Sequence, residues 1–206
     1  MTQAFEDEGV GAKAGDKVIA IAPSIGSIGL KICVFCSAYD LAPQYTEPAK
    51  QFARLIAEHG HTLIWGGSDT GLMSQVASAA QEAGGRIVGI SVEFLRHKVR
   101  QSADEMVIAK DLGERKALLL ARSDVVVVMP GGVGTLDETT EIVEHRKHGH
   151  HDKPIIVMNT DGFYDGLATQ FQRMDEEGFL PKPVDKLLQF TDTPEATMAL
   201  IEQQLL

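Results

Sequence analysis

Short β-branched runs alternate with longer amphipathic segments from Lys31 to the end of the chain. This alternation is typical of βα units that build a parallel sheet with helices on both faces. The sequence therefore predicts an α/β fold of three layers (αβα), with a doubly wound, Rossmann-like parallel sheet in the middle. The predicted strands are 31–36, 61–65, 86–91, 106–109, 124–129, 154–159 and 187–190, and the predicted helices are 43–59, 71–83, 112–122, 134–148, 162–177 and 194–205.

The first thirty residues do not follow this alternation and are rich in Gly, Ala and small polar side chains. We expect 1–30 to be a flexible leader, with an extra strand at 17–22 as an alternative, and 31–206 to be a single domain. An apolar stretch at 18–36 is interrupted by a proline, glycines and a lysine and follows acidic residues. It predicts neither an export signal nor a membrane span.

Charge and cysteine content narrow the function classes. The 206 residues include 19 basic and 29 acidic side chains, a net charge of −10, which disfavours a protein that binds nucleic acid by general cationic attraction. Cys33 and Cys36 have no second pair, so they predict neither a disulfide framework nor a zinc site. Three residues apart in a strand, they should point to opposite faces and pack in the core of a cytoplasmic protein.

Three junctions between a strand and a helix carry candidate chemistry, because ligands of doubly wound folds bind beyond the carboxyl ends of the strands. Ser37 lies in the first junction. The second, WGGSDTGLM at 65–73, contains Gly66, Gly67 and Gly71, whose spacing is not that of GxGxxG. These glycines either let the backbone approach an anion or simply turn the chain.

The third junction, PGGVGTLDE at 130–138, follows four consecutive valines and leads into a helix. Its three glycines can form a backbone nest for an anion, with the Thr135 hydroxyl as an added donor. The lysine of GxxxxGK[ST] is missing, which favours a monophosphate over a nucleoside triphosphate with magnesium. Glu138 and Glu141 share a helix face. Acidic residues in this position either take part in a reaction or only interact favourably with the helix dipole.

The segments GERK at 113–116 and PGGVGTLDE at 130–138, with WGGSDTGLM upstream, resemble the LONELY GUY (LOG) family, long mislabelled as lysine decarboxylases. The resemblance covers essentially 31–206. Members are cytokinin riboside 5′-monophosphate phosphoribohydrolases, or relatives acting on purine nucleoside monophosphates, that release a free base and ribose 5-phosphate. The resemblance therefore implies a homodimeric N-glycosidic bond hydrolase acting on AMP or a cytokinin riboside monophosphate, without metal or organic cofactor.

Residue by residue, the resemblance makes Arg115 and Glu138 the catalytic pair. A carboxylate near C1′ can stabilise the positive charge that develops on the ribose, activate water, or do both. Arg115 would hold the nucleotide or ease departure of the base. The implied substrate-binding residues are Ser37, Gly66, Gly67, Gly71, Lys116, Gly131, Gly132, Gly134, Thr135 and Glu141.

The chain departs from the family pattern on the substrate side. Ser68 stands where members usually carry glycine, and Gly113 where they carry histidine. Glu144, His145 and Lys147 replace a Thr-Trp pair and a Gln. Phosphate capture and bond cleavage should survive these changes, whereas the preferred base stays open.

Alternatives to this interpretation come from three features. Glu141, His145 and His148 share a helix stripe, but without distant ligands we expect no metal there. A non-catalytic carrier of a nucleotide or another phosphorylated ligand would keep the glycine loop without needing Arg115 and Glu138. An amino-acid decarboxylase would need a pyridoxal phosphate lysine or a pyruvoyl group, and neither is recognisable. Apolar residues that could serve either the core or a dimer contact are Leu118, Leu119, Leu120, Ile142 and Val143.

Overall fold

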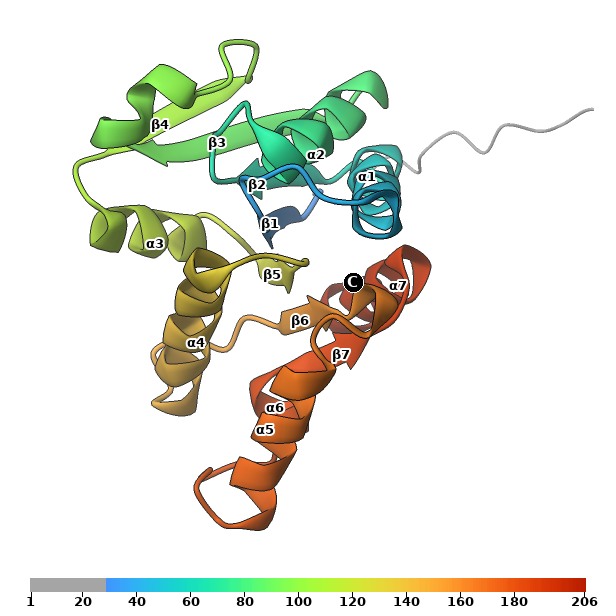
Figure 1. Ribbon diagram of the computed structural model, residues 1–206, viewed down its shortest axis with the longest axis vertical. Helices are drawn as coiled ribbons and strands as arrows, with labels where there is room; N and C mark the ends of the chain where they lie inside the picture. The colour runs from blue at the N-terminus through green and yellow to red at the C-terminus, as the bar shows by residue number, and fades with distance from the viewer. Residues whose placement is uncertain (1–28) are drawn as a thin grey trace, which may run out of the picture.

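The computed structural model describes residues 29–206 (Figure 1). Almost all of the predicted leader, including the alternative strand at 17–22, lies outside the described residues. The strands are β1 (Lys31–Phe35), β2 (Thr62–Trp65), β3 (Arg86–Val92), β4 (Glu105–Ala109), β5 (Val125–Val128), β6 (Ile155–Met158) and β7 (Gln189–Thr191). The helices are α1 (Pro43–Glu58), α2 (Gly71–Glu82), α3 (Leu112–Ala121), α4 (Val133–Lys147), α5 (Asp165–Glu176), α6 (Val184–Leu187) and α7 (Pro194–Leu205), with 3₁₀ turns at Glu93–Lys98 and Thr160–Gly162.

All seven strands pair in parallel, in the order β4-β3-β2-β1-β5-β6-β7. The chain builds outward from β1 to β4 and then returns to place β5 on the other side of β1. This reversal makes the carboxyl ends of β1 and β5 the topological switch point, where ligands of such sheets bind. The predicted doubly wound parallel sheet is confirmed.

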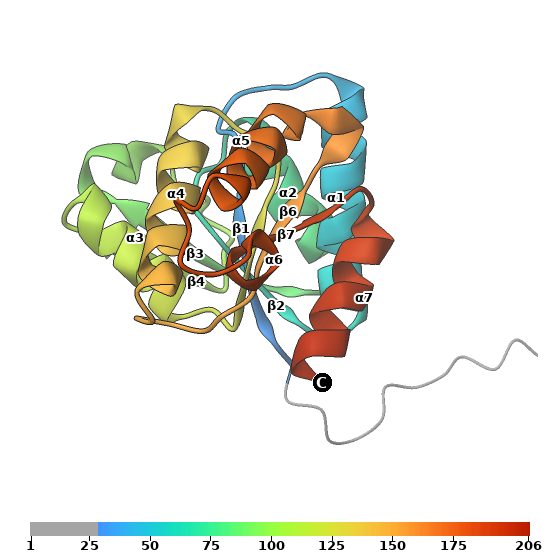
Figure 2. The ribbon, with the colours of Figure 1, turned by 90° about the horizontal axis from the view of Figure 1, so that it is seen from below.

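Two separate apolar clusters, one on each face of the sheet, form the core. Helices α1, α2 and α7 cover one face, and α3, α4, α5 and α6 cover the other (Figure 2). The four valines of β5 are fully buried and alternate between the two clusters, as a strand covered on both sides requires. Cys33 and Cys36 are buried free thiols in opposite clusters, which confirms their predicted packing role.

The core of this chain accounts for three of the five apolar residues that the sequence left open between core and dimer contact. Leu119, Ile142 and Val143 are buried in the cluster under α3 and α4, and Leu118 and Leu120 pack against it. None of the helices in the described part of the chain combines the length and the apolar character that a membrane crossing needs.

Two predicted elements near the carboxyl end are wrong in detail. The helix expected from residue 162 begins at Asp165, because Asp161 and Gly162 have positive φ angles of 54° and 66°. The strand expected at 187–190 is split: Leu187 ends the short helix α6, and β7 begins at Gln189. Pro183 precedes that helix, and its closing bond runs from Leu188 N–H to the Val184 carbonyl at 2.9 Å. The 3₁₀ turn at Glu93–Lys98 was not predicted.

Candidate functional site

The three predicted glycine and serine junctions meet at the carboxyl edge of the sheet. The amide of Ser37, after β1, donates to the carbonyl of Pro130, after β5, at 3.3 Å. The Ser37 carbonyl in turn accepts from Met73 N–H in α2 at 3.1 Å. The loops after β1 and β5 and the first turn of α2, which follows β2, are therefore connected by backbone hydrogen bonds at the switch point. Figure 1 shows how these elements are arranged around β1.

A buried ion pair lies beside these loops. Arg115 of α3 donates from Nη1 to Oε1 of Glu138 on α4 at 2.6 Å, and only 9% of Arg115 and 6% of Glu138 is exposed. The Nε of Arg115 donates to the Ile90 carbonyl of β3 at 3.0 Å. Residues from two helices and a strand thus fix the geometry of the pair that the family resemblance selected.

Capping hydrogen bonds fix the start of α3, the helix that carries Arg115. Asp111 is the N-cap, and its side chain accepts from Glu114 N–H at 2.8 Å. The Glu114 carboxylate accepts from Lys110 N–H at 2.7 Å, so two donors at the helix start are satisfied reciprocally. This pattern, Asp-x-x-Glu at 111–114, was readable from the sequence, although its link to the site was not.

Gly66 makes room for the Arg115 guanidinium. A Cβ at residue 66 would lie 2.3 Å from Nη2 of Arg115, so any larger residue would displace the side chain. The sequence left open whether this glycine lets a ligand approach or turns the chain. The structure supplies another reason, which is packing against the buried cation.

Burial governs the electrostatics of the pair. It raises the pKa of the Glu138 carboxyl above its ordinary value, even though the Arg115 guanidinium acts in the opposite direction. A carboxylate with a raised pKa in a buried position can accept a proton near neutral pH better than an exposed one.

The glycines of the third junction have two different roles. A Cβ at Gly131 would lie 2.2 Å from Oγ1 of Thr135, which is 4% exposed, so Gly131 lets Thr135 pack beneath the loop. Gly132 and Gly134 are exposed, and no described atom lies within 4 Å of a Cβ placed on either. Only these two glycines of the loop leave their surface open to a ligand.

The amino terminus of α4 is suited to an anion. Gly132 is the N-cap and has no side chain to cap the helix, and the first turn of α4 contains no acidic residue. Its first amide groups and the helix dipole therefore face the open surface of Gly132 and Gly134. Buried Tyr164, which sequence reasoning missed, supports the loop by donating from its hydroxyl to the Met129 carbonyl at 2.8 Å.

The remaining predicted positions are close by but less open. Gly67 and Gly71 have positive φ angles of 75° and 56°, and a Cβ at Gly71 would lie 2.4 Å from the carbonyl oxygen of Ala38. They are required by the turn and by close packing of the loops. The Ser37 hydroxyl accepts from Tyr39 N–H at 3.0 Å.

Lys116 and Glu141 form a second ion pair next to the first. Lys116 Nζ is 2.9 Å from Oδ2 of Asp137 and also contacts Glu141, and these carboxylates raise the pKa of Lys116. Glu141 is therefore engaged with lysine and does not join the stripe expected with His145 and His148. His148 lies 2.9 Å from Glu144 instead, and the three residues do not assemble as ligands.

Comparison with known proteins places the chain among relatives of similar length. Residues 73–201 match a family model described as "Possible lysine decarboxylase". Cytokinin riboside 5′-monophosphate phosphoribohydrolase of Mycobacterium tuberculosis is 34% identical over 171 residues, which cover 82% of this chain and 91% of that protein. The Arabidopsis thaliana enzyme of the same name, LOG5, is 34% identical over 169 residues, 81% of this chain and 73% of that protein.

A solved structure shows the same fold. The molybdenum cofactor binding protein of Rippkaea orientalis matches with a TM-score of 0.69 at 24% sequence identity, over 86% of this chain and 98% of that chain. At this level of identity the match concerns the fold alone.

The buried pair makes a testable prediction about stability. Arg115→Met leaves the Glu138 carboxylate buried without its cation, so we expect the free energy of unfolding at pH 8 to fall by about 3–5 kcal/mol. The loss should shrink at pH 5, because a carboxyl whose folded pKa is raised takes up a proton as the pH falls and the lone charge disappears. Urea unfolding at both pH values measures this.

The double variant Arg115→Met/Glu138→Gln is the control, because it removes both charges. It should recover part of the stability that Arg115→Met loses at pH 8. Equal losses at pH 8 and pH 5, with no recovery in the double variant, would contradict the buried ion pair.

Proposed function

This chain belongs to the possible lysine decarboxylase family, also called the LOG family, and we propose that it hydrolyses the N-glycosidic bond of a purine nucleoside 5′-monophosphate. The products would be the free base and ribose 5-phosphate. The observation that carries this proposal is the buried Arg115–Glu138 pair beside the open amino terminus of α4. The proposal thus combines a phosphate site and an acid–base group at the carboxyl ends of the strands.

The phosphate part rests on Gly132 and Gly134. Their open surfaces and the amide groups of the first turn of α4 suit a dianionic monophosphate. Because the whole chain carries a net charge of −10, capture must come from this local arrangement. A 5′-phosphate bound here holds the ribose at the carboxyl edge, where Glu138 lies one turn further along α4.

The hydrolytic part rests on Glu138. Cleavage adds the hydroxyl of water to C1′ and the bonding electrons leave with the base nitrogen. The proton that the water loses balances the proton that the base nitrogen takes up. Glu138 accepts the proton of the attacking water, and its negative charge stabilises the positive charge that develops on the ribose. Arg115, held by the Ile90 carbonyl, keeps the Glu138 carboxylate in place.

The structure does not support the decarboxylation that the family description suggests. A pyridoxal phosphate enzyme needs a lysine that can lose its proton and form a Schiff base. Lys116, the lysine next to the buried pair, contacts two carboxylates that raise its pKa. This environment favours the charged ammonium and works against such chemistry.

We further propose that the chain acts as a cytoplasmic homodimer. Val133 is 84% exposed, and with Leu136 and Phe163 it lines an apolar hollow of about 480 Å³ beside the glycine loop. A second copy that covers this hollow would remove apolar surface from water and screen the site. Light scattering on the purified chain tests this assembly.

The reaction is tested by incubating the purified chain with AMP and with isopentenyladenosine 5′-monophosphate, each beside its unphosphorylated riboside, and measuring the free base by chromatography. We expect release from the monophosphates only. Glu138→Gln should lower turnover by roughly 10²–10⁴-fold, because the proton acceptor is lost, while monophosphate affinity is largely kept. Glu176→Gln, an exposed substitution on α5, is the matched control.

The outcomes separate the enzyme from the carrier. Base release from monophosphates that persists at nearly normal rate in Glu138→Gln would contradict the assigned role of Glu138. Monophosphate binding without base release by the unmodified chain would contradict hydrolysis and favour a non-catalytic carrier of a phosphorylated ligand.

The open surface of Gly134 leads to a separate prediction. Gly134→Ala places a methyl group where no described atom interferes, and alanine favours the helix, so the free energy of unfolding should rise by up to about 1 kcal/mol. The same methyl would meet the bound phosphate and should raise KM by roughly tenfold or more. Urea unfolding and steady-state kinetics measure the two effects. A more stable variant with an unchanged KM would show that the phosphate binds elsewhere.

A further inference from the structure

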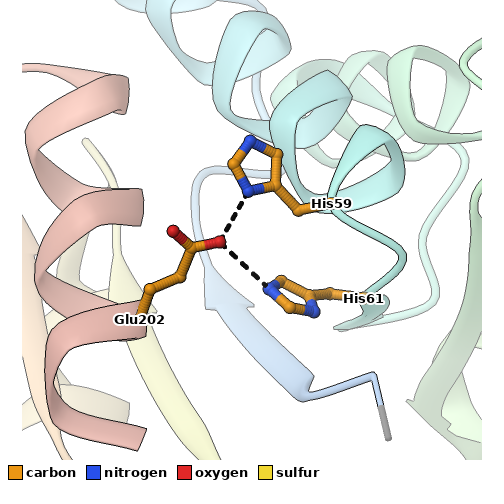
Figure 3. Close-up of side chains that lie close together, drawn as sticks. All are labelled: His59, His61 and Glu202. Atoms are coloured by element: carbon orange, nitrogen blue, oxygen red, sulfur yellow. Dashed lines mark hydrogen bonds and ion pairs between the residues drawn. The ribbon is translucent and has the colours of Figure 1, made fainter. Parts of the chain in front are cut away.

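Two histidines and a glutamate lie close together near the amino-terminal end of β2 (Figure 3). The glycine loops lie at the opposite, carboxyl ends of the strands. His59 is the C-cap of α1, His61 directly precedes β2, and Glu202 lies in the last turns of α7. Because Gly66 follows β2 whereas His61 precedes it, the length of the strand separates this cluster from the Arg115–Glu138 pair. The proposed hydrolysis therefore does not account for the cluster.

The ligand atoms of the cluster are close enough to share an ion. Nδ1 of His59 is 2.6 Å and Nε2 of His61 is 4.0 Å from the same oxygen, Oε1 of Glu202. All three atoms lie within 4.8 Å of one another. Ligands of a tetrahedral zinc ion are about 3.3 Å apart, given metal–ligand distances of about 2.0–2.1 Å. Small side-chain rotations would bring the three atoms to that spacing.

His61 provides a second, independent observation. Its side chain is 3% exposed, and its buried Nε2 has no hydrogen-bond partner among residues 29–206. Buried polar atoms in proteins almost always have a partner, so one without a partner calls for an explanation. Nε2 points toward the Glu202 carboxylate but is too far from it for a hydrogen bond (Figure 3).

We propose that His59, His61 and Glu202 bind a zinc ion that fastens α7 to the corner between α1 and β2. Two imidazoles and one carboxylate are a common ligand set for Zn²⁺, with a water molecule in the fourth position. The ion would add a further link where α1 and α7 already pack together. Gln51 of α1 and Glu195 of α7 already form a hydrogen bond further from the cluster.

The charge of Glu202 and the protonation of His61 favour a zinc ion at this site. Burial lowers the pKa of His61, so its imidazole is neutral at physiological pH and can donate a lone pair. Glu202 supplies the negative charge that a divalent cation needs.

The tautomer of His61 couples the ion to the start of the described chain. Nδ1 of His61 accepts from Leu30 N–H at 3.3 Å, which places the ring proton on Nε2 in the metal-free protein. A metal on Nε2 requires that proton on Nδ1 instead, where it cannot accept from Leu30. Zinc binding and the Leu30 hydrogen bond therefore exclude each other.

The experiment uses the full chain, freed of metal by a chelator and of any histidine tag. Zinc titration by calorimetry should give one ion bound per chain, and the ion should raise the melting temperature. His59→Ala and Glu202→Gln should each weaken zinc binding on the order of 100-fold and abolish the thermal shift. Both side chains are more than one-third exposed, 37% and 36%, so these variants should fold.

His148→Ala is the matched control, because His145, His148 and His150 form the other cluster of rings on the surface. It should leave zinc binding and the thermal shift unchanged. Retained binding in Glu202→Gln, or its loss in His148→Ala, would overturn the proposal. The amide resonance of Leu30 should also shift when zinc binds, and a bound zinc that leaves it unchanged would show that His61 is not a ligand.

Discussion

The ion pair between Arg115 and Glu138 is the interaction on which the arrangement of the site depends. Two opposite charges on largely buried side chains are stable only together, because each would be costly alone. Their pairing fixes α3 against α4 and, through the Ile90 carbonyl, both helices against β3. Gly66 must stay without a side chain for the guanidinium to fit. The catalytic proposal and the packing of this face therefore share the same two residues.

Some glycines of the glycine-rich loops are required for packing, whereas others leave open surface. Gly66, Gly71 and Gly131 are small because Arg115, the Ala38 backbone and Thr135 occupy the space beside them. Gly132 and Gly134 have no described neighbour in that space. A motif of glycines is often taken as one binding site, but here only Gly132 and Gly134 leave open surface that a ligand could occupy. The remaining glycines build the support on which these two rest.

Much of the fold could be predicted from hydrophobic periodicity alone. Four buried valines in β5 and the start of α7, with Thr193 as N-cap and Pro194 after it, carry strong local signals. The short helix α6 does not, since a single turn has no periodicity and its identity depends on Pro183 and on packing. Arg115 and Glu138 were identified as a catalytic pair by the family resemblance. The sequence pattern alone did not decide whether Glu138 takes part in the reaction or only interacts favourably with the helix dipole.

The contacts between segments that are distant in the sequence could not be predicted from the sequence. Nothing near Gly66 indicates that Arg115 will lie against it, and the Ile90 carbonyl has no side-chain signature. His59, His61 and Glu202 are more than 140 positions apart at their extremes, so no local spacing marks them as a cluster. The expected stripe of Glu141, His145 and His148 had the right spacing, yet Glu141 pairs with Lys116. Helical spacing places side chains on one face without deciding their partners.

The pH dependence of kcat/KM for base release shows whether buried Glu138 accepts a proton during cleavage. Because burial raises the pKa of Glu138, we expect kcat/KM to fall on the acid side with an apparent pKa above the usual range of an exposed glutamate. The residual activity of Glu138→Gln should lack this acid limb. An acid limb within the ordinary carboxyl range, or one that persists in the variant, would rule out Glu138 as the proton acceptor.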